Sequence, residues 1–163
     1  MIVCGIVGWK NSGKTYFAQK LIKYFSSKNY KVASIKHAHH NFEIDKPDTD
    51  SYLHRKAGSQ EVIISSSKKW AKIKELDKKN EKSLKELLNE LENPDIVIVE
   101  GYKLDSHPKL EIVSNSKKEY LFNKVKNVRC LITEKNIDSP LPQFNLKQIN
   151  KVAEFILKEL NNE

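Results

Sequence analysis

Residues 8–15 fit the phosphate-binding pattern G-x-x-x-x-G-K-[ST] at every fixed position. The glycines let backbone N–H groups close around phosphate oxygens, and the N-terminus of a following helix adds partial positive charge. Lys14 would reach the β- and γ-phosphates as a catalytic group, and the Thr15 hydroxyl would bind Mg²⁺. The residues expected to contact the nucleotide here are Gly8, Lys10, Asn11, Ser12, Gly13, Lys14, Thr15 and Tyr16, the last through its backbone N–H.

The segments on either side of this pattern have the character that a phosphate-binding loop (P-loop) needs. Residues 2–7 are apolar and rich in β-branched side chains, which predicts a buried parallel strand. After the pattern, Phe17, Leu21 and Phe25 recur at four-residue spacing, which predicts a helix with one apolar face. We therefore interpret residues 8–15 as a nucleotide-binding loop rather than as an incidental glycine turn.

In P-loop proteins that bind Mg²⁺, a carboxylate from a neighbouring strand completes the metal site. Glu100 follows the apolar run at residues 96–99, which predicts a central strand. Its carboxylate would lie at the carboxyl edge of the sheet, where open α/β sheets bind ligands. We expect Glu100 to bind Mg²⁺ together with Thr15 and to act in catalysis, and Gly101 to let the backbone approach the γ-phosphate. Asp95 begins the same strand and lies about five residues away at about 3.3 Å each, too far to share the site.

Strand and helix patterns alternate along the rest of the chain. Strands are expected at residues 31–36, 61–65, 95–101, 109–113 and 128–133. Helices are expected at residues 52–57, 84–91 and 145–160, the last capped by Asn145 with Gln148. The alternating pattern of residues 109–113 indicates a half-exposed strand, and residues 68–76 fit either a short helix or a hairpin. The alternation predicts an α/β fold of the P-loop NTPase type, three-layered, with a mostly parallel central sheet flanked by helices.

Length and charge narrow the class of protein. The 163 residues predict a single P-loop nucleotide-binding domain over residues 1–163. The net charge is +8, and seven lysines lie between Lys68 and Lys82. This stretch has few aromatic residues and no nucleic-acid-binding motif, so we interpret it as a solvated face and expect no nucleic-acid partner.

The apolar runs, cysteines and isolated histidines give further expectations about this protein. No run reaches the roughly 18 apolar residues of a membrane span, so we expect a cytoplasmic protein without a membrane partner. Cys4 and Cys130 each lie in an apolar, strand-like run, which indicates buried free thiols. His54 and His107 are isolated in the sequence, and we expect both at the surface.

A polar block after the second expected strand contains His37, His39 and His40, with Asp45 and Asp50 following. Imidazoles beside a carboxylate can bind a transition metal. They can also be neutral donors to a phosphate or a heterocycle, or belong to a polar loop without a specific role. The spacing leaves these three interpretations open.

Taken together, these segments resemble the molybdopterin-guanine dinucleotide biosynthesis protein B (MobB) family. The resemblance runs from residue 2 to about residue 113. The shared motifs are G-K-T at residues 13–15, K-H-x-H-H-x-F-x-I-D-x-P at 36–47, D-S at 50–51, A-G at 57–58, E-G-Y-K at 100–103 and P-K-x-E at 108–111. The resemblance implies a GTP-binding accessory protein with Mg²⁺ and weak GTPase activity, which assists the guanylyltransferase that couples GMP to molybdopterin.

The same resemblance implies further site residues and an assembly. The additional binding residues would be Lys36, His37, His39, His40, Asp45, Asp50 and Lys103. The implied partners are the molybdenum cofactor guanylyltransferase and the molybdopterin cofactor. Members of the family are similar in forming homodimers, which would let the strand around Ile112 pair across subunits.

Two other functions stay open from the residues alone. A small-molecule kinase would use ATP at the same loop, although only Arg55 and Arg129 could supply an arginine-bearing lid. A metallochaperone GTPase would carry a metal on His37, His39 and His40, although no cysteine pair lies beside them. GTP rests on the resemblance, because the guanine-reading N-K-x-D pattern is missing and residues 133–136 match it poorly. Since no arginine finger or water-orienting glutamine stands out, slow turnover is expected.

Overall fold

The computed structural model describes residues 1–38, 42–76, 80–114 and 119–161. The described chain forms two compact units, one from Met1–His37 with Leu84–Glu163 and the other from Ala38–Ser83. The single functional domain expected over residues 1–163 stays a prediction.

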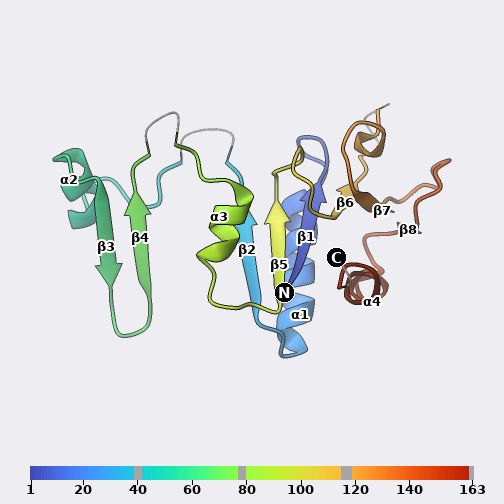
Figure 1. Ribbon diagram of the computed structural model, residues 1–163, viewed down its shortest axis with the longest axis horizontal. Coiled ribbons are helices and arrows are strands. Elements are labelled where there is room, and N and C mark those ends of the chain that lie inside the picture. The colour runs from blue at the N-terminus through green and yellow to red at the C-terminus, as the bar shows by residue number, and fades with distance from the viewer. Residues whose placement is uncertain (39–41, 77–79, 115–118, 162–163) are drawn as a thin grey trace. The chain divides into compact units, whose positions relative to one another are not determined.

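The first unit is built on a six-stranded sheet with strand order β2-β5-β1-β6-β7-β8, in which each described pair is parallel (Figure 1). The strands are β1 (Ile2–Val7), β2 (Val32–Lys36), β5 (Ile96–Glu100), β6 (Lys109–Ile112), β7 (Val128–Ile132) and β8 (Gln143–Phe144). β5 lies between β2 and β1, and its first four residues are buried. The predictions of a mostly parallel sheet and a central strand before Glu100 are therefore confirmed.

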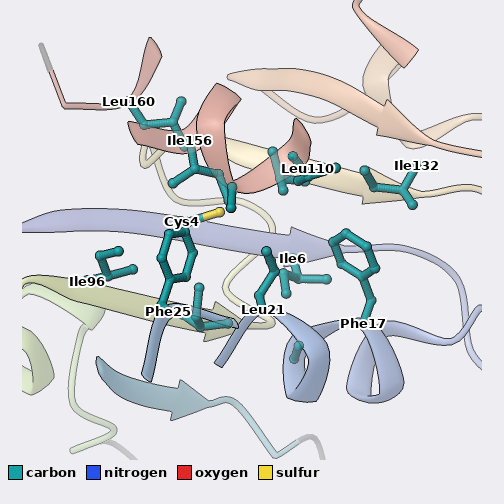
Figure 2. Packing of buried hydrophobic residues seen from close by; sticks show 14 of the residues in the cluster. Cys4, Ile6, Phe17, Leu21, Phe25, Ile96, Leu110, Ile132, Ile156 and Leu160 are labelled. Atoms are coloured by element: carbon teal, nitrogen blue, oxygen red, sulfur yellow. The ribbon is translucent and has the colours of Figure 1, made fainter. Parts of the chain in front are cut away.

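Helices cover both faces of this sheet, because the strands alternate two apolar sets of side chains. The helices are α1 (Lys14–Ser27), α3 (Leu84–Asn89) and α4 (Ile149–Glu159), with a short 3₁₀ helix η1 (Leu121–Asn123). Ile96 and Ile98 pack in one cluster with α1 and α4, whereas Val97 and Val99 pack with Leu84 of α3. Figure 2 shows the first cluster, with the aromatic and leucine side chains of α1 facing β1. The three-layered P-loop NTPase-type fold is confirmed.

The predicted helices of the first unit are confirmed with small changes at their ends. Phe17, Leu21 and Phe25 of α1 are fully buried, as their spacing predicted. α4 begins at Ile149, four residues later than expected, and its N-cap is Gln148 without a side-chain cap, so the predicted capping by Asn145 is wrong. The Gln148 side chain instead accepts the Asn145 N–H at 2.9 Å in the turn before the helix.

β6 differs from its prediction. All four of its residues are buried, including Lys109 at 0% and Glu111 at 1% exposure. It pairs with β1 on one side and β7 on the other, so it has no free edge. The expectations that this strand is half-exposed and that it pairs across subunits are both wrong. The charged side chains of Lys109 and Glu111 do not face water, because they form hydrogen bonds with backbone groups inside the protein.

The Lys109 ammonium group shows how a charge is kept inside this strand. Its Nζ donates to the carbonyl of His107 at 2.6 Å and of Lys126 at 3.3 Å, and also to that of Asp105. Burial lowers the pKa of Lys109, partly opposed by the Asp105 carboxylate. These contacts hold the 101–108 connection against the turn that precedes β7.

His107 is not the surface residue that the sequence indicated. Both of its ring nitrogens are buried without a hydrogen-bond partner among the described residues. The ring covers β1 at Gly5, where an added Cβ would lie 2.5 Å from the His107 Nε2 atom. Burial, with a smaller contribution from Lys109, lowers the pKa of His107 to about 4, so the ring is neutral at pH 7.

Both cysteines lie in the apolar interior of the first unit. Cys4 and Cys130 are buried free thiols, as predicted. Burial raises the pKa of Cys4 to about 12, and it also raises the pKa of Cys130. None of the helices in the described parts of the chain combines the length and apolar character needed to cross a bilayer.

The second unit contains α2 (Asp50–Lys56) and an antiparallel hairpin of β3 (Glu61–Ser65) and β4 (Trp70–Lys74). The open choice at residues 68–76 is thus decided in favour of a hairpin strand. Lys74, the register partner of Glu61, binds its carboxylate at 2.7 Å, and Lys72 binds the same carboxylate diagonally across the hairpin at 2.9 Å. Lys78 and Lys79 of the basic stretch lie outside the described residues.

Candidate nucleotide-binding site

The P-loop connects the end of β1 to the start of α1, in the strand–turn–helix order that the sequence predicted. Gly13, at the helix N-cap, has a φ of 93°, a conformation that favours glycine. Gly8 is needed for space instead, because an added Cβ would lie 2.5 Å from Ser12 Oγ and 2.7 Å from the Ile112 carbonyl oxygen. Asn11 has a φ of 62° and turns the chain between them.

Two unmet hydrogen-bonding groups in this loop fit an anionic ligand. The first N–H groups of an α-helix have no partner within the helix, and α1 has no side-chain cap to supply one. The Ser12 hydroxyl is buried without a partner among the described residues. An unpaired buried hydroxyl is costly, and phosphate oxygens would satisfy both the Ser12 hydroxyl and the first N–H groups of α1. The residues present therefore fit a phosphate group.

Lys14 lies over the loop. Its Nζ donates to the carbonyls of Gly8 at 3.0 Å and Trp9 at 2.8 Å. Burial lowers the pKa of Lys14, while the Glu100 carboxylate raises it and the ammonium groups of Lys36 and Lys103 lower it further. The structure therefore brings three lysines and one carboxylate to the same edge of the sheet.

Thr15 and Glu100 meet at this edge. The Thr15 hydroxyl lies 3.0 Å from Glu100 Oε1 and 3.2 Å from Oε2 and donates to the carboxylate. The Glu100 side chain is 16% exposed. A hydroxyl and a carboxylate are oxygen ligands that suit Mg²⁺. The two residues are thus as close as the predicted metal site requires; metal binding itself stays a prediction.

The end of β2 lies beside the same carboxylate. Lys36 is the register partner of Glu100, and its Nζ lies 3.9 Å from Glu100 Oε1. The next residue, His37, donates its backbone N–H to the Glu100 carbonyl at 2.8 Å. Its ring lies against Tyr102, with ring centroids 4.6 Å apart and planes 32° apart. Lys36, His37 and Glu100 therefore lie close together, as expected for residues that were predicted to form one binding site.

Gly101 is needed for a reason that the sequence did not reveal. It has a φ of 105°, and an added Cβ would lie 2.6 Å from the His37 Cβ atom. Tyr102 follows with a φ of 47°, an uncommon conformation for a side-chain-bearing residue. The glycine therefore allows the turn after β5 and the close packing of His37. Its approach to a γ-phosphate stays a prediction.

Other predicted binding residues are exposed or belong to the second unit. Lys10, Asp50 and Lys103 are exposed, and the Tyr16 side chain is 56% exposed with the Lys20 ammonium 4.7 Å from its ring centre. His39 and His40 lie outside the described residues.

Asp45 already has a strong partner within the second unit. Its carboxylate receives Arg55 Nε at 3.0 Å and Nη2 at 2.6 Å, and its side chain is 3% exposed. The hydrogen bond from Arg55 lowers the pKa of Asp45. The same guanidinium group also binds Glu43 and Glu75. Asp45 thus has a structural contact beside its predicted role in ligand binding.

Among the described residues, no group of three histidine, cysteine or acidic side chains is arranged to hold a metal ion. The metal interpretation of the polar block depends on His39 and His40, which fall outside that description.

Sequence reasoning missed the residues that support the P-loop from the β6 side. Glu111 accepts the backbone N–H groups of Leu121 at 2.7 Å and Phe122 at 2.8 Å. The Trp9 indole donates to the Glu119 carbonyl at 2.9 Å. The P-K-x-E motif was a signal for Glu111, but its alternating pattern indicated a solvent-facing strand.

The loop at residues 133–136, considered for base recognition, forms a local turn. The Thr133 hydroxyl donates to the Lys135 carbonyl at 2.8 Å and accepts its N–H at 3.2 Å. Glu134 accepts the Leu146 N–H at 3.2 Å. The loop is at the carboxyl end of β7, a place from which a base can be read in this type of sheet.

Comparison with known proteins agrees with these observations. The family model of molybdopterin guanine dinucleotide synthesis protein B matches residues 3–134. The molybdopterin-guanine dinucleotide biosynthesis adapter protein of Haemophilus influenzae is 31% identical over 154 residues, which cover 93% of this chain and 85% of that protein. The adapter protein of the same name from Escherichia coli is 35% identical over 104 residues, covering 63% of this chain and 59% of that protein.

Solved structures show the same fold. The crystal structure of Bacillus subtilis MobB has a TM-score of 0.77 and 25% identity over the full length of both chains. That of a MobB protein homolog from Bacillus stearothermophilus has a TM-score of 0.76 and 21% identity, again over both full chains. Because the family model spans residues 3–134 and a relative matched over 85% of its length is 31% identical, this chain belongs to the molybdopterin guanine dinucleotide synthesis protein B (MobB) family.

Proposed function

We propose that this chain is a GTP-binding adapter protein of molybdopterin-guanine dinucleotide biosynthesis. It binds Mg-GTP at the P-loop, hydrolyses it slowly, and assists the guanylyltransferase that attaches GMP to molybdopterin. The names of the relatives support the pathway and the adapter role. The observation that carries nucleotide binding is the contact of Thr15 with Glu100, 3.0 Å apart beside the N-terminus of α1.

Each part of the site has a separate task in this proposal. Backbone N–H groups of residues 8–16 and the Ser12 hydroxyl bind phosphate oxygens, and Lys14 neutralises charge on the β- and γ-phosphates. Thr15 and Glu100 hold Mg²⁺, which when bound supplies charge neutralisation at the phosphates. Since the site is built mainly to bind and orient, slow hydrolysis is the expected outcome.

The partners follow from charge and from the family. The net charge of +8 favours association with acidic surfaces and with phosphate-bearing ligands such as the molybdopterin cofactor. A homodimer in the cytoplasm is part of the proposal. Because both edges of β6 are paired, the dimer would use another surface.

Titration calorimetry with GTP and ATP, each with and without Mg²⁺, tests the proposal. We expect GTP to bind at least tenfold more tightly than ATP, about 1.4 kcal/mol, and Mg²⁺ to strengthen binding. Lys14→Ala should lose triphosphate binding and keep its circular dichroism spectrum, because the Lys14 ammonium group contacts only loop carbonyls among the described residues. A preference for ATP would contradict the adapter assignment and favour a small-molecule kinase. Retained affinity in Lys14→Ala would contradict nucleotide binding at this loop.

A further inference from the structure

Lys36 lies where parallel pairing places a side chain next to the predicted metal ligand. It is the last residue of β2, and its register partner in β5 is Glu100. Two and four residues earlier in β5, Ile98 and Ile96 pack against α1, and Val32 of β2 packs in the same cluster. Because side chains alternate along a strand, Lys36 and Glu100 extend on the α1 face of the sheet. This is the face on which Thr15 contacts Glu100.

The contact between Lys36 and Glu100 is too weak to be the whole role of this lysine. Nζ and Oε1 are 3.9 Å apart, and the Lys36 side chain is 64% exposed. Exposed ion pairs of this kind contribute little to stability. The ammonium group is therefore able to leave the carboxylate for a stronger anion.

The charges around Lys14 favour a ligand with several negative charges. The groups that act on Lys14 are the carboxylate of Glu100 and the ammonium groups of Lys36 and Lys103. Together with Lys14 they amount to three positive charges and one negative charge. The negative charges of a triphosphate would outweigh this net positive charge. A divalent cation bound at Glu100 would replace Lys36 as the partner of the carboxylate, which leaves the lysine able to contact the triphosphate.

The base of Lys36 is held in place by the residue that follows it. The His37 N–H donates to the Glu100 carbonyl at 2.8 Å, and the His37 ring contacts Tyr102. Gly101 leaves room for the His37 Cβ. Backbone anchoring of this kind reduces the reorganisation needed when charge develops at the site.

We propose that Lys36 is a catalytic residue of the GTPase reaction, a lysine that stabilises the charge on the transferring γ-phosphoryl group from within the same chain. This inference rests on the proposed function. In the reaction, water forms a bond to the γ-phosphorus while the bond from that phosphorus to the β–γ bridging oxygen breaks. The electron pair leaves with GDP, and the proton of the water passes to the released phosphate or to solvent. Lys36 keeps its protons and contacts the γ-phosphate oxygens more closely in the transition state.

The size of the effect follows from the chemistry of lysine. Arginine fingers accelerate GTP hydrolysis by about 10³–10⁵-fold, in part through a planar fork that lysine lacks. Removal of a single donor at a developing oxyanion costs about 10²–10³-fold. We therefore expect loss of Lys36 to slow hydrolysis by about 100-fold, with little change in the binding of GTP itself.

The test compares Lys36→Met and Lys36→Arg with a matched control, Lys31→Met. Lys31 is an exposed lysine just before β2, at the opposite end of the strand. Three quantities are measured with Mg²⁺: single-turnover hydrolysis of GTP, the affinity for guanosine 5′-[β,γ-imido]triphosphate, and the affinity for GDP with aluminium fluoride, which mimics the transferring phosphoryl group. The last is a binding readout that is independent of turnover.

We expect Lys36→Met to bind the imido analogue within about threefold of the unsubstituted protein and to lose at least 30-fold in affinity for GDP with aluminium fluoride. Lys36→Arg should recover most of this affinity, and Lys31→Met should be unchanged. The inference is overturned if Lys36→Met keeps its affinity for the fluoride complex, or if both affinities fall by the same factor. It is also overturned if the unsubstituted protein binds GTP but neither hydrolyses it nor binds the fluoride complex. If the unsubstituted protein binds no GTP, the proposed function fails first.

Discussion

At the scale of single residues, the site depends on a few close contacts rather than on the motif letters alone. Gly8, Gly13 and Gly101 are all part of recognisable motifs, and they are needed either for space or for the turn of the backbone. Gly8 leaves room for the Ser12 hydroxyl and the Ile112 carbonyl, Gly13 turns the chain into α1, and Gly101 leaves room for His37. A substitution at any of them would disturb the site through backbone geometry.

His107 leads to a prediction about pH. Its pKa in the folded protein, about 4, is below the ordinary value of about 6.5, because the ring is buried. A lowered pKa means that the folded state binds fewer protons on this group than the unfolded state. Stability contributed by the neutral ring is therefore complete above about pH 6.5 and is lost as the pH falls towards 4.

Urea unfolding at pH 7 and pH 5 measures this contribution. We expect the protein to lose more stability over this interval than a His107→Phe variant, whose ring fills the same space without titrating. Equal losses in the two proteins would show that the pKa of His107 is the same in the folded and unfolded states, and would contradict the lowered pKa.

At the scale of elements, β6 is the strand on which the two sides of the site depend. Lys109 fixes the connection that arrives from β5, and Glu111 accepts the first two backbone N–H groups of η1. Two residues before η1, the Glu119 carbonyl accepts the indole N–H of Trp9 in the P-loop. The buried charges of this strand thus hold loops in place that hydrophobic packing alone would leave free to shift.

Glu111 provides the test at this scale. Its carboxylate satisfies two backbone N–H groups, and an unsatisfied buried donor costs about 1–3 kcal/mol. We expect Glu111→Ala to reduce the free energy of unfolding by about 2–4 kcal/mol and Glu111→Gln, which keeps one acceptor, to lose less. Urea unfolding at pH 7 measures both. Equal stability of Glu111→Ala and the unsubstituted protein would mean that water replaces the carboxylate.

At the scale of the whole molecule, the two compact units are stabilised by different interactions. The first unit has an extensive buried core between its sheet and its helices. In the second unit, Val62 is the buried hydrophobic residue among those described, and Ile63 and Trp70 are each 65% exposed. The contacts of Arg55 with Glu43, Asp45 and Glu75 connect the segment before α2, the helix itself and the end of β4.

Arg55→Met therefore gives a prediction for the second unit. Removal of the guanidinium group leaves the nearly buried Asp45 carboxylate without its partner, which favours local opening of residues 38–83. We expect trypsin to cleave this unit about tenfold faster or more, while GTP binding at the P-loop is kept. Lys46→Met, an exposed residue near the same contacts, is the control. Uniform loss of structure in both units would contradict independent stabilisation.

Much of this molecule could be predicted from local patterns. The buried strands at residues 2–7 and 96–100 and the helix faces follow from periodicity, because backbone geometry alone decides which residues share a face. The approach of Glu100 to Thr15 followed from a topological rule, since parallel strands in such sheets bring their carboxyl ends to one edge.

Tertiary structure decided what depends on contacts between distant segments. The burial of Lys109, Glu111 and His107 could not be foreseen, because charge or polarity in a sequence does not reveal whether backbone groups will satisfy it. The choice of a hairpin at residues 70–74 was equally open, since a short apolar pattern fits either element. The pairing of Lys36 with Glu100 depends on which strand lies beside β5, and this is a property of the assembled sheet. Local geometry thus set the elements and the motif, whereas the packing of distant segments determined which charged groups are buried and which meet at the site.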